Sequence, residues 1–284
     1  MPKGTHRAIL RSSPSPFISF GPVVMALSLS VCILTYNEEE NLPGCLDSLV
    51  DLESEIVILD SGSTDRTRAI AEEAGASFHI HSFDDFGSQY NRLFNLATRP
   101  WILNLDADER LSPELSRSVR ELFKDPDRLE RYRGFSFNRL NYFIGKPIYH
   151  SGWAPDPLVR LFRKDSGEME RRQVHVQILV KGEIASLNGN LIHFTYRSLD
   201  GYLSKSTKYA KLAAREMQIR GRSPSLWALL AHPAGMAVKM YFLRRGFLDG
   251  KEGLFLAGLY AYYTFLKYLY LYYPDGRSPS SQKE

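Results

Sequence analysis

Short apolar runs alternate with amphipathic stretches from residue 27 to about residue 125. The apolar runs have the length of buried strands and cover residues 29–35, 56–60, 77–80 and 101–105. The stretches between them, 38–50, 65–74 and 86–97, repeat apolar residues at helical spacing. Pro43 places the start of the first helix near Asn41, because proline is tolerated only in a first turn. This alternation predicts an α/β fold, a mostly parallel sheet with helices on both faces.

The pattern changes after residue 133. Strand-like runs follow at 135–140, 158–163, 174–180 and 191–194, and we expect them to form an insertion or a mixed half of the sheet. Beyond residue 198 the chain becomes helical, basic and aromatic. We therefore predict four segments: a flexible extension (1–26), a catalytic domain (27–197), a helical region (198–273) and a flexible tail (274–284).

The composition is that of an ordinary globular protein, with 44% hydrophobic residues, 24% charged residues and a net charge of +4. The first residues are basic and precede an apolar stretch, as in a signal peptide. That stretch runs into the first predicted strand, so we expect no signal peptide. The two cysteines, Cys32 and Cys45, lack metal-ligand spacing, and Cys32 is expected to be a buried thiol. Without a disulfide framework, a cytoplasmic location follows.

The candidate chemistry begins at the end of the run 101–105, which leads into Asp106-Ala107-Asp108. Side chains alternate along an extended segment, so Asp106 and Asp108 would point to the same side, where a parallel sheet binds its ligands. Two carboxylates that face one crevice suit a hard cation, Mg²⁺ or Mn²⁺, which would also grip a diphosphate. The alternative is a strand end with two solvated aspartates.

Two further strand ends carry polar motifs. The first strand ends in T-Y-N-E-E at 35–39, where Asn37 or Glu38 would bind a polar ligand. The alternative is that Asn37 or Asn41 caps the next helix. The second ends in D-S-G-S-T-D at 60–65, where Asp60 would bind a base or ribose and Gly62 permits a tight turn. A capped turn without a ligand is the alternative. No G-x-G-x-x-G precedes Asp60, which argues against a nicotinamide enzyme.

These three motifs together closely resemble those of the family 2 glycosyltransferases of the GT-A (Rossmann-like) fold, inverting enzymes that use nucleotide-diphosphate sugars. The wider resemblance is to the subgroup that includes the lipopolysaccharide core β-1,4-glucosyltransferases, and it covers roughly residues 27–272. It includes N-Y-F-I-G-K at 141–146, G-W-A-P-D at 152–156, R-L-F-R at 160–163, V-H at 174–175, H-F-T-Y at 193–196 and G-F-L-D-G at 246–250.

The resemblance implies a role for each matching residue. Asp106 would contact the ribose or the metal, Asp108 would bind the metal, and Ala107 lies between them in the same site. The residues implied for the nucleotide, its ribose and its diphosphate are Thr35, Asn37, Glu38, Asp60, Asn91 and Arg92. Ser63, in the second strand-end motif, is a further candidate. Arg160 or Arg163 would reach the diphosphate while the apolar pair between them packs, and a solvated strand face is the alternative.

The catalytic base is the point at which the sequence departs from the family pattern. Inverting transfer needs a group that takes the proton of the acceptor hydroxyl. Many relatives have Glu after the Val-His pair, but this chain has Val176. The remaining candidates are Asp156 and His175, for which a turn-forming aspartate and a core histidine are the alternatives.

The helical region carries its own signal. Residues 202–251 hold ten Lys or Arg against two acids, and residues 254–273 hold seven tyrosines and one charge, Lys267. This composition is typical of an interfacial helix beside anionic headgroups or a phosphorylated glycolipid. A helix packed on the sheet under a basic surface is the alternative. No nucleic-acid motif accompanies the charge, so we expect no nucleic-acid partner.

The sequence thus predicts a metal-dependent inverting glycosyltransferase on the cytoplasmic face of the inner membrane. It would move a hexose, glucose being the expected sugar, from a UDP-sugar to a lipopolysaccharide core or other lipid-linked saccharide. A non-catalytic nucleotide-sugar binding protein and a nucleotidyltransferase are the alternatives. The latter should carry a Gly-rich, basic triphosphate loop, which T-Y-N-E-E is not.

Overall fold

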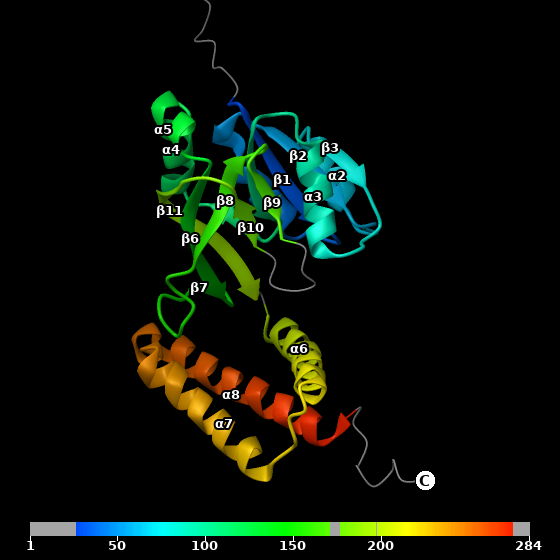
Figure 1. Cartoon of the computed structure of the whole chain (residues 1–284), viewed down its shortest axis with the longest axis vertical. Coiled ribbons are helices and arrows are strands. Elements are labelled where there is room, and N and C mark those ends of the chain that lie inside the picture. The colour runs from blue at the N-terminus through cyan, green and yellow to red at the C-terminus, as the bar shows by residue number, and fades with distance from the viewer. Residues whose placement is uncertain (1–26, 171–176, 197, 275–284) are drawn as a thin grey trace, which may run out of the picture.

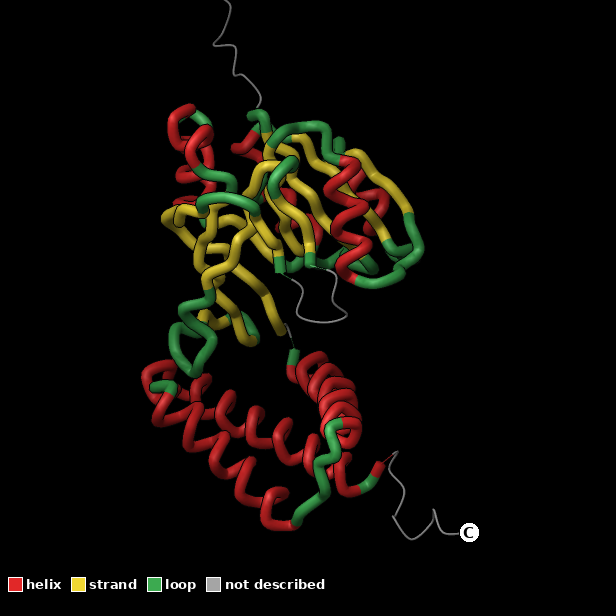
Figure 2. Tube along the Cα trace, viewed as in Figure 1, coloured by secondary structure: helices red, strands yellow, loops and turns green. Residues whose placement is uncertain are grey.

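A nine-stranded sheet forms the centre of the amino-terminal part of the chain, and helices alone form the carboxyl-terminal part (Figures 1 and 2). The computed structural model describes residues 27–170, 177–196 and 198–274. The strand order is β3-β2-β1-β4-β8-β6-β11-β5, with the short β7 paired to β6. The sheet therefore has a parallel half and a mixed half.

The parallel half is the part that the hydrophobic pattern predicts. Its strands are β1 (Leu29–Thr35), β2 (Glu55–Asp60), β3 (Ser77–Ile80) and β4 (Trp101–Asp106). Thr35 pairs with Asp60, and Leu34 pairs with Asp106, so the carboxyl ends of three strands meet at one edge. Ligand sites of parallel sheets form at this edge.

Helices cover both faces of this half because the strands are apolar on both sides. Val31 and Ile33 pack with one group of helices, whereas Cys32 between them packs with α3 on the other face. Both cysteines are buried and free, as expected. The helices of this half are α1 (Leu42–Asp47), the 3₁₀ turn η1 (Val50–Leu52), α2 (Thr67–Glu73) and α3 (Phe86–Leu96), whereas α4 (Pro113–Leu122) packs mainly on β11 and is followed by α5 (Pro126–Arg131). The expected α/β fold of the GT-A type is confirmed.

The mixed half adds antiparallel pairs. β8 (Pro157–Arg163) pairs antiparallel with β4 and with β6, and β6 pairs parallel with β11. The other strands are β5 (Glu109–Leu111), β6 (Gly134–Phe143), β7 (Lys146–Pro147) and β11 (Ile184–Tyr196), with β9 (Gly167–Met169) and β10 (Ile178–Val180) in a separate two-stranded sheet. Of the predicted strand 174–180, the first residues lie outside the described residues.

β11 is much longer than the predicted run 191–194. Its register shifts between Ser186 and Asn190, and Gly189 there has φ of +100°. A Cβ on Gly189 would lie 2.4 Å from the Leu115 nitrogen, so only glycine fits. The bulge breaks the alternation of apolar and polar residues, which is why the pattern predicts only the end of the strand.

Three long helices form the carboxyl-terminal region: α6 (Leu199–Ile219), α7 (Leu226–Val238) and α8 (Gly250–Tyr272). The helical segments η2 (Lys239–Leu243) and η3 (Gly246–Asp249) join α7 to α8. α8 contacts both α6 and α7 and lies between them (Figure 1). The stretch 254–273 therefore packs mainly on the other two helices rather than on the sheet.

The two parts are joined by an apolar cluster and by a buried carboxylate. Leu256 of α8 and Tyr202 of α6 pack with Phe143, Ile148 and Trp153 of the α/β domain. Asp249, whose side chain is 2% exposed, accepts hydrogen bonds from the backbone and side chains of the loop between β7 and β8. Its donors are Tyr149 N, His150 N, His150 Nδ1 and Ser151 Oγ, at 2.9–3.1 Å. We call this contact the Asp249 clamp.

Candidate active site

The loops that follow β1 and β2 are bonded to each other. The Asn37 backbone nitrogen donates to Ser63 Oγ at 2.7 Å, and the Thr64 nitrogen donates to Asn37 Oδ1 at 2.8 Å. The Glu38 nitrogen donates to Thr67 Oγ1 at 2.8 Å. Asn37 has φ of +54°, a conformation that asparagine tolerates better than most residues. The two predicted nucleotide motifs therefore form one platform.

The buried side chain of Asp60 stabilises this platform through hydrogen bonds. Its carboxylate is buried and accepts hydrogen bonds from Thr35 Oγ1, from the Gly62 and Ser63 nitrogens, and from Ser63 Oγ, at 2.5–2.9 Å. Gly62 has φ of +98°, which the turn requires. In this structure Asp60 thus acts as the cap of a tight turn, and Thr35 and Ser63 are its partners.

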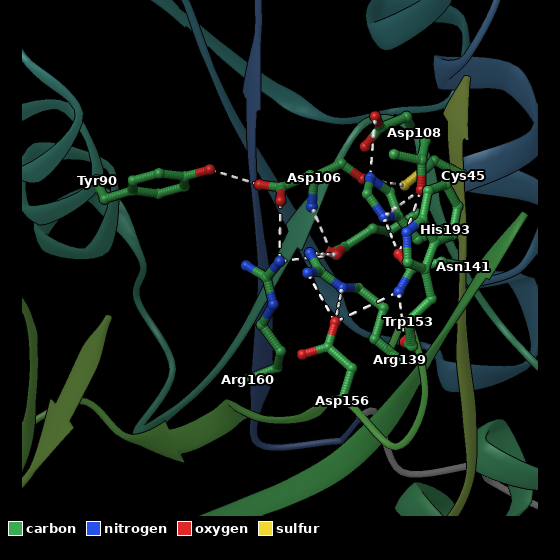
Figure 3. Close-up of polar contacts among 12 residues, drawn as sticks. Cys45, Tyr90, Asp106, Asp108, Arg139, Asn141, Trp153, Asp156, Arg160 and His193 are labelled. Atoms are coloured by element: carbon green, nitrogen blue, oxygen red, sulfur yellow. Dashed lines mark hydrogen bonds and ion pairs between the residues drawn. The ribbon is translucent and has the colours of Figure 1, made fainter. Parts of the chain in front are cut away.

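A buried ion network lies at the end of β4 (Figure 3). Asp106 Oδ2 accepts from Arg160 Nη2 at 2.8 Å, and its Oδ1 accepts from the Tyr90 hydroxyl. The same Arg160 nitrogen donates to Glu109 Oε1 at 2.7 Å, and Glu109 Oε2 accepts from the Asp106 backbone nitrogen at 3.1 Å. One arginine from β8 thus holds carboxylates from β4 and β5.

Burial and charge act on these groups in opposite directions. Burial disfavours the ionised form of Asp106, but the charge of Arg160 and the hydrogen bonds from Tyr90 and Arg160 outweigh it and lower the pKa of Asp106. Burial raises the pKa of Glu109, Arg160 opposes this, and Asp106 adds to it. Burial also raises the pKa of Tyr90, which stays a donor. Asp106 is therefore the member of the network most firmly held as an anion.

The side chain of Asp106 is 31% exposed, so the two aspartates are similarly accessible, but Asp108 makes fewer polar contacts. Its side chain is 27% exposed, and Oδ2 lies 3.4 Å from His193 Nε2. His193 Nδ1 lies 2.7 Å from Asn141 Oδ1, and the Asn141 amide donates to the Trp153 carbonyl at 3.2 Å (Figure 3). Asn141 of β6 thereby holds the ring of His193, on β11, against Asp108.

Asp156 lies on the other side of Asn141. Arg139 Nε donates to Asp156 Oδ2 at 2.8 Å, Arg139 Nη2 forms an ion pair with the same oxygen at 2.8 Å, and Asn141 Nδ2 lies 3.4 Å from it. Arg139 also lies 3.7 Å from Glu109 and so connects Asp156 with the ion network. Across the described residues, every hydrogen bond that the Asp156 carboxylate accepts goes to Oδ2, which leaves Oδ1 for another partner.

The remaining predicted residues have other surroundings. The side-chain amide of Asn91 forms two hydrogen bonds with the Met169 backbone: Nδ2 donates to the carbonyl oxygen, and Oδ1 accepts from the nitrogen. These bonds connect α3 with β9. Arg92 lies 2.9 Å from His81 and from Gln89 and 3.3 Å from Asp84. Ala107 is buried in the turn between β4 and β5. His175 lies outside the described residues.

The sequence did not point to Tyr90, Glu109 or Arg139 as site residues. Glu109 directly follows the D-A-D motif, yet nothing in the pattern distinguishes it from a solvated charge. Its complete burial depends on β5 pairing with β11 and on the arginines of β8 and β6, which are contributed by distant parts of the chain. His193 and Asn141 belonged to quoted motifs without an assigned role.

A divalent metal fits the donor chemistry in part. Within the ranges that the structure describes, no group of three or more His, Cys, Asp or Glu could hold an ion. Both oxygens of Asp106 already accept hydrogen bonds, whereas the Asp108 carboxylate has, among the described residues, one side-chain contact, 3.4 Å from His193. Magnesium often uses one or two carboxylates together with substrate phosphates. The residues therefore suit a metal ion whose coordination shell would consist of the Asp108 carboxylate and phosphate oxygens of the substrate.

Comparison with known proteins shows the family to which the chain belongs. The family model described as glycosyl transferase family 2 matches residues 30–178, which include β1 to β4, the D-A-D motif and Asp156. The chain therefore belongs to glycosyltransferase family 2 and is a transferase.

Curated relatives are similar over most of their length. A lipopolysaccharide core biosynthesis glycosyltransferase of Rhizobium meliloti, LpsC, is 31% identical over 256 residues, which cover 86% of this chain and 92% of LpsC. An uncharacterised glycosyltransferase of Rickettsia typhi is 25% identical, with 84% and 85% covered.

Solved structures of low sequence identity are also similar. Staphylococcus aureus TarS 1–349 in complex with UDP matches with a TM-score of 0.43 and 15% identity, covering 88% of this chain and 92% of TarS 1–349. Glucosyl-3-phosphoglycerate synthase of Mycobacterium tuberculosis matches with a TM-score of 0.45 and 19% identity, covering 68% and 80%.

Proposed function

We propose that this chain transfers a hexose from a UDP-sugar, with inversion, to a saccharide of the lipopolysaccharide core or to another lipid-linked saccharide. The observation that carries the proposal is the meeting of three strand ends, with the platform of β1 and β2 beside Asp106 and Asp108. Similarity to LpsC supports the acceptor class. Glucose is the sugar that we expect.

The nucleotide would lie against the platform. Thr35, Asn37, Glu38, Asp60 and Ser63 would form its wall, with the hydrogen bonds around Asp60 keeping that wall rigid. Asn91, Arg92, Ala107 and Arg160 remain candidates for the diphosphate side. Because Arg160 already holds two carboxylates, its contribution would be to fix Asp106 rather than to move toward the substrate.

Asp108, with Asp106 behind it, would hold Mg²⁺ or Mn²⁺. When bound, such an ion neutralises the diphosphate that leaves. His193 would orient the Asp108 carboxylate from the opposite side.

Asp156 would be the base. Arg139 and Asn141 hold Oδ2, so Oδ1 can accept the proton of the acceptor hydroxyl. The hydroxyl oxygen then forms a bond to the anomeric carbon, the bond from that carbon to the diphosphate breaks, and UDP leaves. His175 remains the second candidate for this role.

The acceptor class implies a place of action. A lipid-linked saccharide is presented at a membrane, so we propose that the protein works attached peripherally to the cytoplasmic face of the inner membrane. The excess of basic residues in the helical region supports an anionic surface as partner.

The first test is calorimetric titration of the full chain with UDP, GDP and their sugars, with and without Mn²⁺. We expect metal-dependent binding of UDP that Asp108→Ala abolishes and that Asp165→Ala, an exposed carboxylate between β8 and β9, leaves unchanged. Equal UDP affinity of wild type and Asp108→Ala in the presence of Mn²⁺ would refute the metal assignment.

One observation favours a second candidate, a non-catalytic nucleotide-sugar binding protein. The carboxylate of Asp156 is already engaged by Arg139. A transfer or donor-hydrolysis assay separates the two functions. A transferase should lose turnover but keep UDP affinity in Asp156→Asn, whereas a binder shows no turnover in the wild type.

A further inference from the structure

Helix α7 is apolar on two sides, and among the described helices its main packing partner is α8. Leu229, Pro233, Met236 and Met240, which follow at helical spacing into η2, are half-buried or buried. α8 is the neighbour of α7 along this length, and the His232 ring contacts the Tyr268 ring of α8. A helix that is apolar all round is normally enclosed by protein or by lipid.

The other side of α7 is open. Leu226, Leu230, Val238 and Phe242 are separated by four or eight residues, so they share one side of the helix, and each is more than half exposed. Trp227 and Leu243 lie next to them in the sequence and are more exposed still. We call these six side chains the α7 face. The segment Leu226–Leu243 is also the one helix of the described ranges that is long and apolar enough to cross a membrane.

The charge around the α7 face is predominantly basic, although Arg220 is paired with Glu216, the acid that precedes this part of the sequence. From residue 217 to residue 248 the chain contains no Asp or Glu but holds five basic residues: Arg220, Arg222, Lys239, Arg244 and Arg245. All five are exposed. A second copy of this face would bring like charges together, whereas an anionic lipid surface would neutralise them.

We propose that the α7 face docks into one leaflet of an anionic lipid bilayer, with its basic residues at the level of the headgroups. The inference deepens, and for its biological use rests on, the membrane attachment that is part of the proposed function. It assigns the attachment to α7 and η2 rather than to the tyrosine-rich stretch 254–273. The end of η2 is fixed beside the α/β domain, where Arg244 O accepts from Ser151 N at 2.9 Å, so the helix docks rather than crosses.

The tryptophans provide a direct test. Trp101 and Trp153 are 5% and 8% exposed, whereas Trp227 is 78% exposed. Vesicles of phosphatidylcholine and phosphatidylglycerol should shift the emission of the full chain to the blue, and brominated acyl chains should quench it. Trp227→Phe should keep vesicle binding but abolish the shift. An unchanged wild-type emission spectrum in these vesicles would overturn the proposal.

Flotation with the same vesicles tests the face as a whole. The triple variant Leu226→Ser, Leu230→Ser, Phe242→Ser should lower partitioning by more than about tenfold, since burial of even one such side chain is worth that factor. The matched control is Val50→Ser with Ile80→Ser, two apolar side chains of similar exposure in the α/β domain, which should change nothing. Arg222→Gln with Lys239→Gln should weaken binding and reduce its dependence on salt.

Further outcomes separate this proposal from its competitors. Equal flotation of the triple variant and the control would overturn it, as would equal binding to pure phosphatidylcholine. A wild-type dimer that the triple variant converts to a monomer, without vesicle binding, would assign the face to a second copy instead. UDP titration of the same variants keeps the proposed function separate, since vesicle binding without UDP binding would refute the function and support the docking.

Discussion

The α/β domain and helix α7 contrast in where they place their apolar and charged side chains. In the domain, Leu103 and Ile33 are fully buried, and charged residues such as Arg160 and Glu109 are buried among them and paired. On α7, Leu226 and Leu230 are largely exposed, and the charges nearby are basic and exposed. The domain completes its own interior, whereas the helix presents a surface that needs a partner.

This difference shows what apolar composition leaves open. The stretch 254–273 looks like the membrane element by its tyrosines and single charge, but α8 packs between two helices. α7 is shorter and less aromatic, yet it is the helix left uncovered. Exposure, which depends on the neighbours in the fold, decides between them.

The largest expected effect tests the buried charges of the domain. Arg160→Met removes the cation that holds Asp106 and Glu109, and breaking such a buried pair costs about 3–5 kcal/mol of unfolding free energy. Denaturant unfolding measures the loss. Arg68→Met is the matched control, because its exposed pair with Glu72 contributes less than about 1 kcal/mol. Similar losses for both variants would mean that the network contributes no special stability.

The next effect compares one residue type in both regions. Leu103→Ala should cost about 2–5 kcal/mol, because it leaves a cavity in the domain core. Leu230→Ala on the α7 face, where the side chain is 66% exposed, should stay within about 0.5 kcal/mol. Both are measured by denaturant unfolding without lipid. A large cost for Leu230→Ala would mean that α7 has a partner within the protein after all.

A smaller effect tests the contact between the regions. Asp249→Asn weakens the Asp249 clamp and leaves buried donors poorly matched, at a cost of about 1–3 kcal/mol. The loop it holds leads to Trp153 and Asp156, so transfer should fall while UDP affinity stays constant. Asp51→Asn, an exposed carboxylate of η1, is the control. A parallel loss of UDP affinity would contradict a role limited to the acceptor side.

The smallest effect is a pH dependence. Burial raises the pKa of Glu109 in the folded protein, so above the ordinary range of a glutamate the folded protein holds a proton that the unfolded chain has released. The contribution of Glu109 to the unfolding free energy therefore falls as pH rises through this window toward about 7, the raised pKa of Glu109 in the folded protein. Glu109→Gln should lack this fall. Parallel pH curves for the two proteins would contradict the raised pKa.

Much of the parallel half could be predicted from the sequence. Its strands are fully buried apolar runs that end in turn chemistry, so local pattern and tertiary structure agree, and the strand ends Thr35, Asp60 and Asp106 lie at one edge as expected. The mixed half was predicted less completely. β5 has three residues, and β11 contains a glycine bulge. Neither strand therefore shows an alternation of apolar and polar residues that is long enough to predict it.

The candidate site likewise has one part that the sequence predicts and another that it does not. Asp106 and Asp108 follow from one short motif, because both lie on a single strand end. Tyr90, Arg139 and Arg160 reach this point from α3, β6 and β8, and their meeting depends on strand order, which no local pattern contains. Long-range pairing of buried charges is therefore the part of the site that only the fold reveals.

The Asp249 clamp has a geometric consequence for a protein at a bilayer. It fixes the loop that leads to Asp156 to the same short segment that joins α7 to α8. With α7 lying in a leaflet, Asp156 would lie at a fixed distance from the surface of the lipid. This fixed distance would select acceptors by how far their growing end extends from the membrane, in addition to any recognition of the sugar itself.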